Sequence, residues 1–192
     1  MMSYQAQTLG SFLRRVAIDY VRYGYVRYAL REIPPEKDPT LIDCKLVALY
    51  GVTRCRVTRM RRRKQGLANV QYVRFGHSFV LLATEGHHPI FENLRTFDIR
   101  SAPLYFRGYS IGVKQGKPCV MVAPNEWSKV QHRFSQIALH QKESVEHKLN
   151  SLPYYHFPGV IRQKLTLVTA INKRRKQAGL LPLSLAFKGQ RL

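Results

Sequence analysis

Apolar residues recur at helical spacing near the start of the chain. Over about residues 11–22 they follow Ser11, which is a suitable N-cap, and Gly24 provides a stop. Asp38 is a strong N-cap for a second helix, because proline follows it at the first helical position, where the missing N–H costs nothing. Gly51 closes this second helix. The pattern therefore predicts two helices in the first fifty residues.

Alternation of apolar and polar residues and a short continuous apolar run, Phe79–Ala83, predict strands in the middle of the chain. Residues 25–33 form one strand, and residues 69–84 form a tight hairpin with a buried return strand. Two further segments, Pro103–Val113 and Pro118–Ala123, read as the strands of a second hairpin that turns around Gly116. The strands cluster in the first two thirds of the sequence.

Helical spacing returns in the last third of the chain. A helix capped by Asn125 is predicted first, then a shorter one at about 143–150, then a long one from Pro158 to Gly179. The predicted fold class is α+β: a mostly antiparallel sheet of two hairpins plus an N-terminal strand, packed with N-terminal helices and followed by a C-terminal helical region. Residues 1–123 would form the sheet domain and residues 124–192 the helical region, packed as one compact unit.

The charge balance narrows the class of partner. Lys and Arg number 32 against 11 Asp and Glu, which gives a formal net charge of +21. Self-repulsion at this level opposes compactness, so a polyanionic partner is expected. The cations are spread along the chain rather than gathered on one amphipathic helix, which favours nucleic acid over a membrane surface. Three cysteines without a CxxC pair indicate a reducing compartment, and a cytoplasmic location is predicted.

One segment, residues 54–64, is far more basic than the rest. Its seven cations are Arg54, Arg56, Arg59, Arg61, Arg62, Arg63 and Lys64. Arginine suits planar, bidentate contacts with phosphate and stacking on bases. The alternative is a solvated charged face, and periodicity leaves a loop and a short helix equally open. The segment is nevertheless the first candidate for nucleic-acid contact, because no acid compensates its charge.

A second basic cluster ends the long C-terminal helix. It consists of Lys173, Arg174, Arg175 and Lys176. Cations at a helix C-terminus are favoured by the helix dipole alone, so a structural role and phosphate contact are both open.

Aromatic and basic residues also alternate on the predicted strands. Tyr72 and Phe75 flank Arg74, and Tyr105 and Tyr109 flank Arg107. Such rings can stack on unpaired bases, with the arginines contacting phosphate. Aromatic residues at alternate strand positions are more often part of the core, so a stacking platform and an apolar core remain alternatives here.

Only one polar cluster suggests enzymatic chemistry. Glu85, His87 and His88 follow the buried strand of the first hairpin, and two imidazoles beside a carboxylate can act as acid and base in phosphodiester cleavage. A His-His-Pro loop with few neighbouring acids is a poor match to known nuclease patterns. No zinc-ligand spacing, P-loop, KH loop or RRM signature occurs, so neither a metal nor a cofactor is expected.

The sequence therefore predicts a non-catalytic nucleic-acid-binding protein. RNA is favoured over duplex DNA because the sheet is rich in aromatic residues and no helix-turn-helix or zinc signature is present. The expected role is an accessory or structural subunit of a ribonucleoprotein with other proteins as partners, for example in a mobile element or an RNA-guided system. The alternatives are a small nuclease that uses Glu85, His87 and His88, and a ribosomal protein.

Overall fold

The computed structural model describes residues 4–184 and confirms an α+β fold with antiparallel sheets. The chain divides into two compact units: Met1–Leu104 with Ile111–Cys119, called unit 1, and Tyr105–Ser110 with Val120–Leu192, called unit 2. The predicted boundary after Ala123 lies close to Val120, where the main segment of unit 2 begins. Whether the two units pack as one body stays a prediction.

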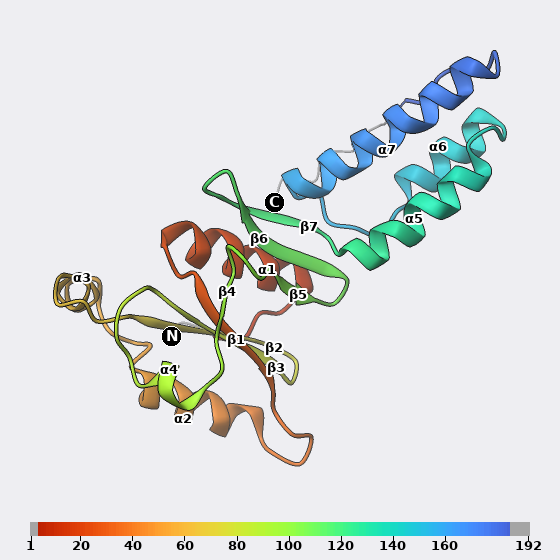
Figure 1. The fold of residues 1–192 in the computed structure, drawn as a ribbon. Helices are drawn as coiled ribbons and strands as arrows, with labels where there is room; N and C mark the ends of the chain where they lie inside the picture. The colour runs from red at the N-terminus through yellow and green to blue at the C-terminus, as the bar shows by residue number, and fades with distance from the viewer. Residues whose placement is uncertain (1–3, 185–192) are drawn as a thin grey trace. The chain divides into compact units, whose positions relative to one another are not determined.

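Unit 1 is built on a four-stranded antiparallel sheet (Figure 1). Its strands, in the spatial order β2-β3-β1-β4, are β2 (Val70–Phe75), β3 (Ser78–Ala83), β1 (Arg27–Glu32) and β4 (Phe97–Asp98). The predicted hairpin is confirmed: Phe75 pairs with Ser78 across a turn in which Gly76 has a φ of 60°, a value that favours glycine. Segment Tyr4–Ala6 bonds to Arg74 along the outer edge of β2.

The first predicted helix exists, but its regular part is short. Its successive segments are α1 (Leu9–Arg14), a π-helical stretch (Arg15–Tyr20) and a 3-10 turn (Val21–Tyr23). The N-cap is Thr8 rather than the predicted Ser11, because the two hydroxyl groups form a reciprocal capping box. Gly24, with a φ of 86°, ends the helix as predicted.

Two helices cover opposite faces of this sheet (Figure 1). Helix α2 (Pro39–Tyr50) begins at Asp38, whose carboxylate accepts a hydrogen bond from the Thr40 N–H, and it is closed by Gly51, as predicted. Its partly buried side chains pack on the sheet face that carries Val70 and Tyr72. Helix α1 lies on the other face, where Phe12 and Phe75 place their ring centroids 6.3 Å apart. Both faces of β2 are therefore covered.

A buried ion pair ties α2 to β2. The Asp43 carboxylate accepts hydrogen bonds from Arg74 Nε at 2.8 Å and from the Tyr72 hydroxyl. Arg74 also donates to the Gly76 carbonyl oxygen at 2.8 Å. The exposed side-chain fractions of Arg74 and Asp43 are only 7% and 13%, so this pair is a structural element of unit 1.

The second hairpin belongs to a separate three-stranded sheet, β5-β6-β7. Its strands are β5 (Leu104–Phe106), β6 (Tyr109–Lys114) and β7 (Lys117–Val122). The turn around Gly116 is confirmed. The prediction of one strand over Pro103–Val113 is wrong, because Arg107 and Gly108, with φ values of 43° and 80°, make an additional two-residue turn. Gly108 is the turn residue that the sequence shows here, whereas arginine at the first turn position is uncommon.

Four further helices occur in the described part of the chain. They are the short α4 (Ile90–Asn93) in unit 1, and α5 (Pro124–Ile137), α6 (Lys142–Asn150) and α7 (Pro158–Gln177) in unit 2. The three helices of unit 2 match the prediction except that Ala123, not Asn125, is the N-cap of α5, because Pro124 takes the first helical position. Trp127, Phe134 and Leu149 are buried there.

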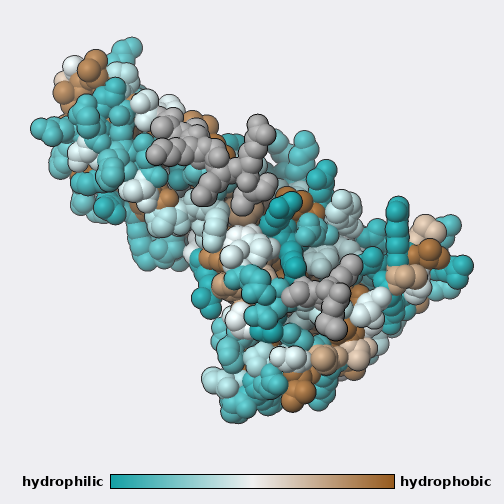
Figure 2. Space-filling view, turned by 180° about the vertical axis from the view of Figure 1, so that it is seen from behind, coloured by the Kyte–Doolittle hydropathy of each residue, from teal (hydrophilic) through white to brown (hydrophobic). Residues whose placement is uncertain are grey.

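Apolar side chains are not gathered into one broad outer patch on the face shown in Figure 2. Hydrophilic residues dominate that face, and hydrophobic ones occur in scattered groups. Within residues 4–184, the helices are all too short or too polar to cross a lipid bilayer.

Candidate nucleic-acid interface

The basic segment folds as helix α3 (Arg56–Lys64), which resolves the choice between loop and helix. Six of its nine residues are cations, none is acidic, and none is buried. The last turn holds Arg61, Arg62, Arg63 and Lys64, where the negative end of the helix dipole partly offsets their mutual repulsion. The helix therefore presents a dense positive charge to solvent within unit 1.

Some of these cations serve the fold. Three hydrogen bonds anchor α3: Arg62 Nη2 to the Ala68 carbonyl at 3.0 Å, Arg63 Nη2 to the Tyr23 carbonyl at 2.7 Å, and Asn69 Nδ2 to the Arg59 carbonyl at 3.0 Å. Arg54, just before the helix, donates to the Tyr50 carbonyl at 3.3 Å and lies against Gly51. Arg62 is partly buried, and desolvation lowers the pKa of its guanidinium.

The remaining cations do not bond to backbone carbonyls within residues 4–184. The side chains of Arg56, Arg59, Arg61 and Lys64 make no hydrogen bond or ion pair with any residue in the described part of the chain. The seven cations that look alike in the sequence thus divide into three that hold backbone carbonyls and four that are available to a polyanion.

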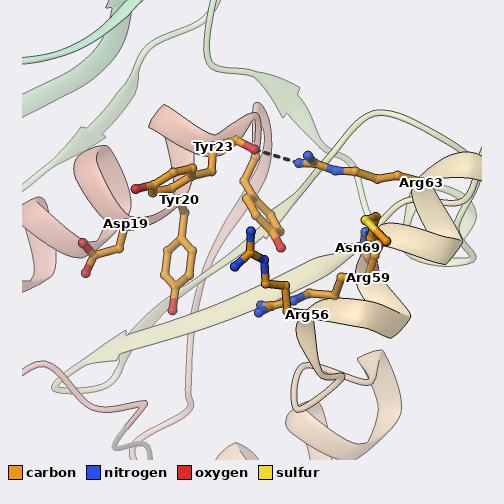
Figure 3. A pocket seen from close by; sticks show the side chains of 9 residues that line it. Asp19, Tyr20, Tyr23, Arg56, Arg59, Arg63 and Asn69 are labelled. Carbon is orange, nitrogen blue, oxygen red and sulfur yellow. Dashed lines mark hydrogen bonds between the residues drawn. The ribbon is translucent and has the colours of Figure 1, made fainter.

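Two pockets that share four lining residues, here called the two lobes of the α3 cleft, lie between α3 and the π-helical stretch; Figure 3 shows the smaller one. The lobes have volumes of about 420 and about 700 Å³, which lie within the usual range of ligand sites. Asp19, Tyr20, Arg56 and Arg59 border both lobes. Figure 3 shows Arg56 and Arg59 extending from α3 toward Tyr20, and Arg63 bonded to Tyr23 across the cleft.

The rim of the cleft is cationic and its wall is aromatic. Asp19 is the single carboxylate among the described lining residues, against several arginines. Tyr20 packs edge-on against Tyr25, with ring centroids 5.7 Å apart. Burial raises the pKa of Tyr20, so its hydroxyl stays neutral and can both donate and accept a hydrogen bond. Rings beside arginines are the combination found where proteins hold unpaired bases.

Two buried amides border the same cleft. Asn69 and Gln71 lie two residues apart, and so share a face of the β2 segment; Asn69 borders the smaller lobe and Gln71 the larger. Their exposed fractions are 2% and 5%. Asn69 Oδ1 and Gln71 Nε2 have no hydrogen-bond partner among the described residues. Leaving such a group unpaired costs about 1–3 kcal/mol, so native structures rarely do so without a ligand or an ordered water.

Sequence reasoning missed Tyr20, Asn69 and Gln71. One signal was present: two amide side chains occupy alternate positions at the start of a strand whose neighbouring positions are apolar. Which helix would cover that face of the strand was not visible in the sequence.

Most of the predicted stacking platform lies in the core. Tyr72 is fully buried and bonded to Asp43, and Phe75 packs on Phe12. In unit 2, Tyr109 is 3% exposed and its hydroxyl accepts a hydrogen bond from the Tyr155 N–H. Tyr72 and Tyr109 therefore offer no free face to a base, whereas Phe75 is partly exposed beside Phe12. Arg74 is buried as well, so the apolar-core alternative holds for this part of the platform.

Two members of the platform are exposed. Tyr105, in β5, is 54% exposed. Arg107 lies next to it in sequence, with its guanidinium carbon 5.8 Å from the centroid of the Phe106 ring. Both belong to unit 2, and no second exposed ring accompanies Tyr105 on its strand.

The C-terminal basic cluster also consists of two kinds of cation: arginines that bond within the fold and lysines that are exposed. Arg175, only 2% exposed, donates to the carbonyls of Ala138, His140 and Leu181 at 2.7–2.9 Å. Arg174 donates to the Ser135 carbonyl at 2.7 Å. These arginines hold α7 against the end of α5. Lys173 and Lys176 are exposed on the same turns and make no hydrogen bond or ion pair within the described residues.

The predicted acid–base loop does not converge on one point. Glu85 pairs with Arg100 at 2.7 Å, His87 is exposed, and His88 is 6% exposed. His88 Nδ1 accepts a hydrogen bond from the Ile90 N–H, and its ring packs against Tyr50. No group of three or more His, Cys, Asp or Glu side chains within the described residues could hold a metal ion. His88 thus has a structural role: it fixes the start of α4 through the Ile90 N–H.

The burial of His88 predicts a pH dependence of stability. Desolvation, aided by Arg62 and Arg54, lowers the pKa of its imidazole, so the folded state favours the neutral ring. The unfolded chain therefore binds the proton first, and the free energy of unfolding should fall as the pH drops below about 6.5. His88→Asn keeps an acceptor for the Ile90 N–H but cannot titrate, and we expect it to flatten this part of the pH profile. Denaturant titrations of the wild type and of the variant across that range measure the effect, and an equal loss of stability in both would reject His88 as its source.

Comparison with known proteins does not assign the chain to a family. No protein-family model matches the chain, and no curated protein is detectably similar to it. The geometry and charge of the α3 cleft are therefore the features that indicate a function.

Proposed function

We propose that this protein binds nucleic acid through α3 and the α3 cleft. The supporting observation is the division of the basic segment: Arg62 and Arg63 fix the helix, and this leaves Arg56, Arg59, Arg61 and Lys64 free to contact phosphates. Holding unpaired cations close together costs free energy that a bound polyanion recovers. A helix that is anchored by some of its arginines also keeps the others preorganised for binding.

RNA is the favoured partner. Two of the free arginines, Arg56 and Arg59, adjoin a tyrosine wall and buried amides, a combination suited to unpaired bases, which RNA exposes in loops and single strands. The chain would act without catalysis, as an accessory or structural subunit of a ribonucleoprotein in the cytoplasm. The free thiols of Cys44, Cys55 and Cys119 are compatible with that reducing compartment.

The test is the salt dependence of binding to single-stranded RNA, duplex RNA and duplex DNA of matched length. The dissociation constant should rise steeply with salt, because each phosphate contact releases counterions. Single-stranded RNA is expected to bind most tightly. Failure to bind any of the three at low salt would remove the proposal. Sequencing of the nucleic acid that co-purifies from cells at low salt then identifies the partner, and ribosomal RNA with co-sedimenting ribosomes would assign the protein to the ribosome.

A further inference from the structure

The floor of the α3 cleft distinguishes between classes of ligand. A bare phosphate offers only acceptors, so it could use the free Gln71 N–H but would leave Asn69 Oδ1 unpaired. An apolar ligand would leave both amides unpaired. A ligand that satisfies the floor must therefore carry a hydrogen-bond donor and an acceptor together.

A nucleobase meets this requirement. Every base carries both donors and acceptors on its edges, and asparagine and glutamine side chains are common partners of those edges. The orientation of the Asn69 amide is set by its own structure, because Nδ2 already donates to the Arg59 carbonyl and Oδ1 is left as the free acceptor. The floor thus offers an acceptor from Asn69 and a donor from Gln71.

The walls of the cleft suit the rest of a nucleotide. Tyr20 borders both lobes and provides a ring, and Arg56 and Arg59 stand at the rim, where a phosphate attached to an inserted base would pass. The cleft is unlike a simple phosphate groove, because its polar floor is almost completely buried.

We propose that the α3 cleft takes up one unstacked base of a single-stranded RNA and reads its edge with Asn69 and Gln71. This inference rests on the proposed function, since the phosphates of the same strand would lie along α3. It adds that binding is not only electrostatic: it requires a base as well as a chain of phosphates.

The experiment uses the full chain with two probes, a single-stranded RNA and inorganic polyphosphate of similar charge, which has no bases. Gln71→Met keeps the length of the side chain but removes the donor. We expect this variant to bind the RNA about tenfold more weakly and polyphosphate with unchanged affinity. Its melting temperature should be equal or higher, because an unpaired buried donor has been replaced by an apolar group. Gln131→Met, on the exposed surface of α5, is the matched control and should change neither affinity.

A second variant removes the wall instead of the floor. Tyr20→Leu should also weaken binding of the RNA and leave polyphosphate binding unchanged, because stacking requires a ring on both partners. Homopolymeric strands compared on the wild-type chain then show which base the cleft prefers.

The outcomes separate the two proposals. If Gln71→Met and Tyr20→Leu both bind RNA as the wild type does while arginine replacements on α3 weaken it, base insertion is overturned and nucleic-acid binding stands. An equal loss on RNA and polyphosphate would also overturn base insertion, because the effect would not depend on a base. If the wild-type chain binds neither probe, the proposed function itself fails.

Discussion

Replacement of Arg56, Arg59 and Arg61 by glutamine should weaken binding of single-stranded RNA about hundredfold near 0.1 M salt. Each phosphate contact contributes about 0.7 to the slope of the logarithm of affinity against the logarithm of salt concentration. Three lost contacts therefore remove about two logarithmic units of the affinity that is gained between 1 M and 0.1 M salt. The slope of affinity against salt should fall in parallel. These side chains hold no part of the fold, and their removal relieves repulsion on α3, so the free energy of unfolding should be unchanged or slightly higher.

A matched control separates a defined interface from general attraction. Lys114, Lys117 and Arg133 are exposed cations outside α3 that make no hydrogen bond or ion pair within the described residues. Their replacement by glutamine removes the same charge. We expect this control to bind RNA within a few-fold of the wild type, measured by fluorescence anisotropy. Equal losses in the two triple variants would mean that α3 is no special contact surface, and the assignment of the interface would be rejected.

Asp43→Asn should destabilise unit 1 by about 3–5 kcal/mol. The amide can still accept a hydrogen bond from the Tyr72 hydroxyl, but the Arg74 guanidinium, with only 7% of its side chain exposed, loses its counter-ion. An uncompensated buried charge accounts for most of the expected cost. Denaturant unfolding measures the change, and the midpoint should shift without a change in slope if cooperativity is retained.

Two comparisons test whether burial causes this effect. The exposed pair Glu126–Lys129, broken by Glu126→Gln, should cost less than about 1 kcal/mol. Neutralising both sides, Asp43→Asn with Arg74→Met, should recover most of the lost stability, because no charge is then left in the core and the amide still accepts a hydrogen bond from the Tyr72 hydroxyl. A double variant as unstable as Asp43→Asn would show that the hydrogen bonds, not the charge balance, carry the contribution.

The ion pair also bears on the α3 cleft. Arg74 and Gln71 belong to the same strand, and Arg74 is held on one face of β2 while Gln71 borders the cleft on the other. A fixed β2 keeps the buried amide in position. The stability of unit 1 and the geometry of the proposed base site are therefore linked through one strand.

Local physical chemistry determined much of this fold from the sequence. Asp38, Pro39 and Gly51 specified the ends of α2, and the turns at Gly76 and Gly116 specified two hairpins, because capping and turn residues act on their immediate neighbours. The turn at Arg107–Gly108 was missed although Gly108 is a turn residue, because arginine rarely adopts the positive φ that the first turn position requires.

The sequence by itself determined the dense positive charge of residues 54–64. That charge is sufficient to predict a polyanionic partner. Only the tertiary structure decided which cations are free, because Arg62 and Arg63 bond to carbonyls of Ala68 and Tyr23 that local pattern does not bring near them. It likewise placed Tyr72 and Arg74 in the core and left the amides of Asn69 and Gln71 at the cleft. A side chain's partner depends on which distant segment covers its face of the strand, and periodicity indicates the face but not the segment.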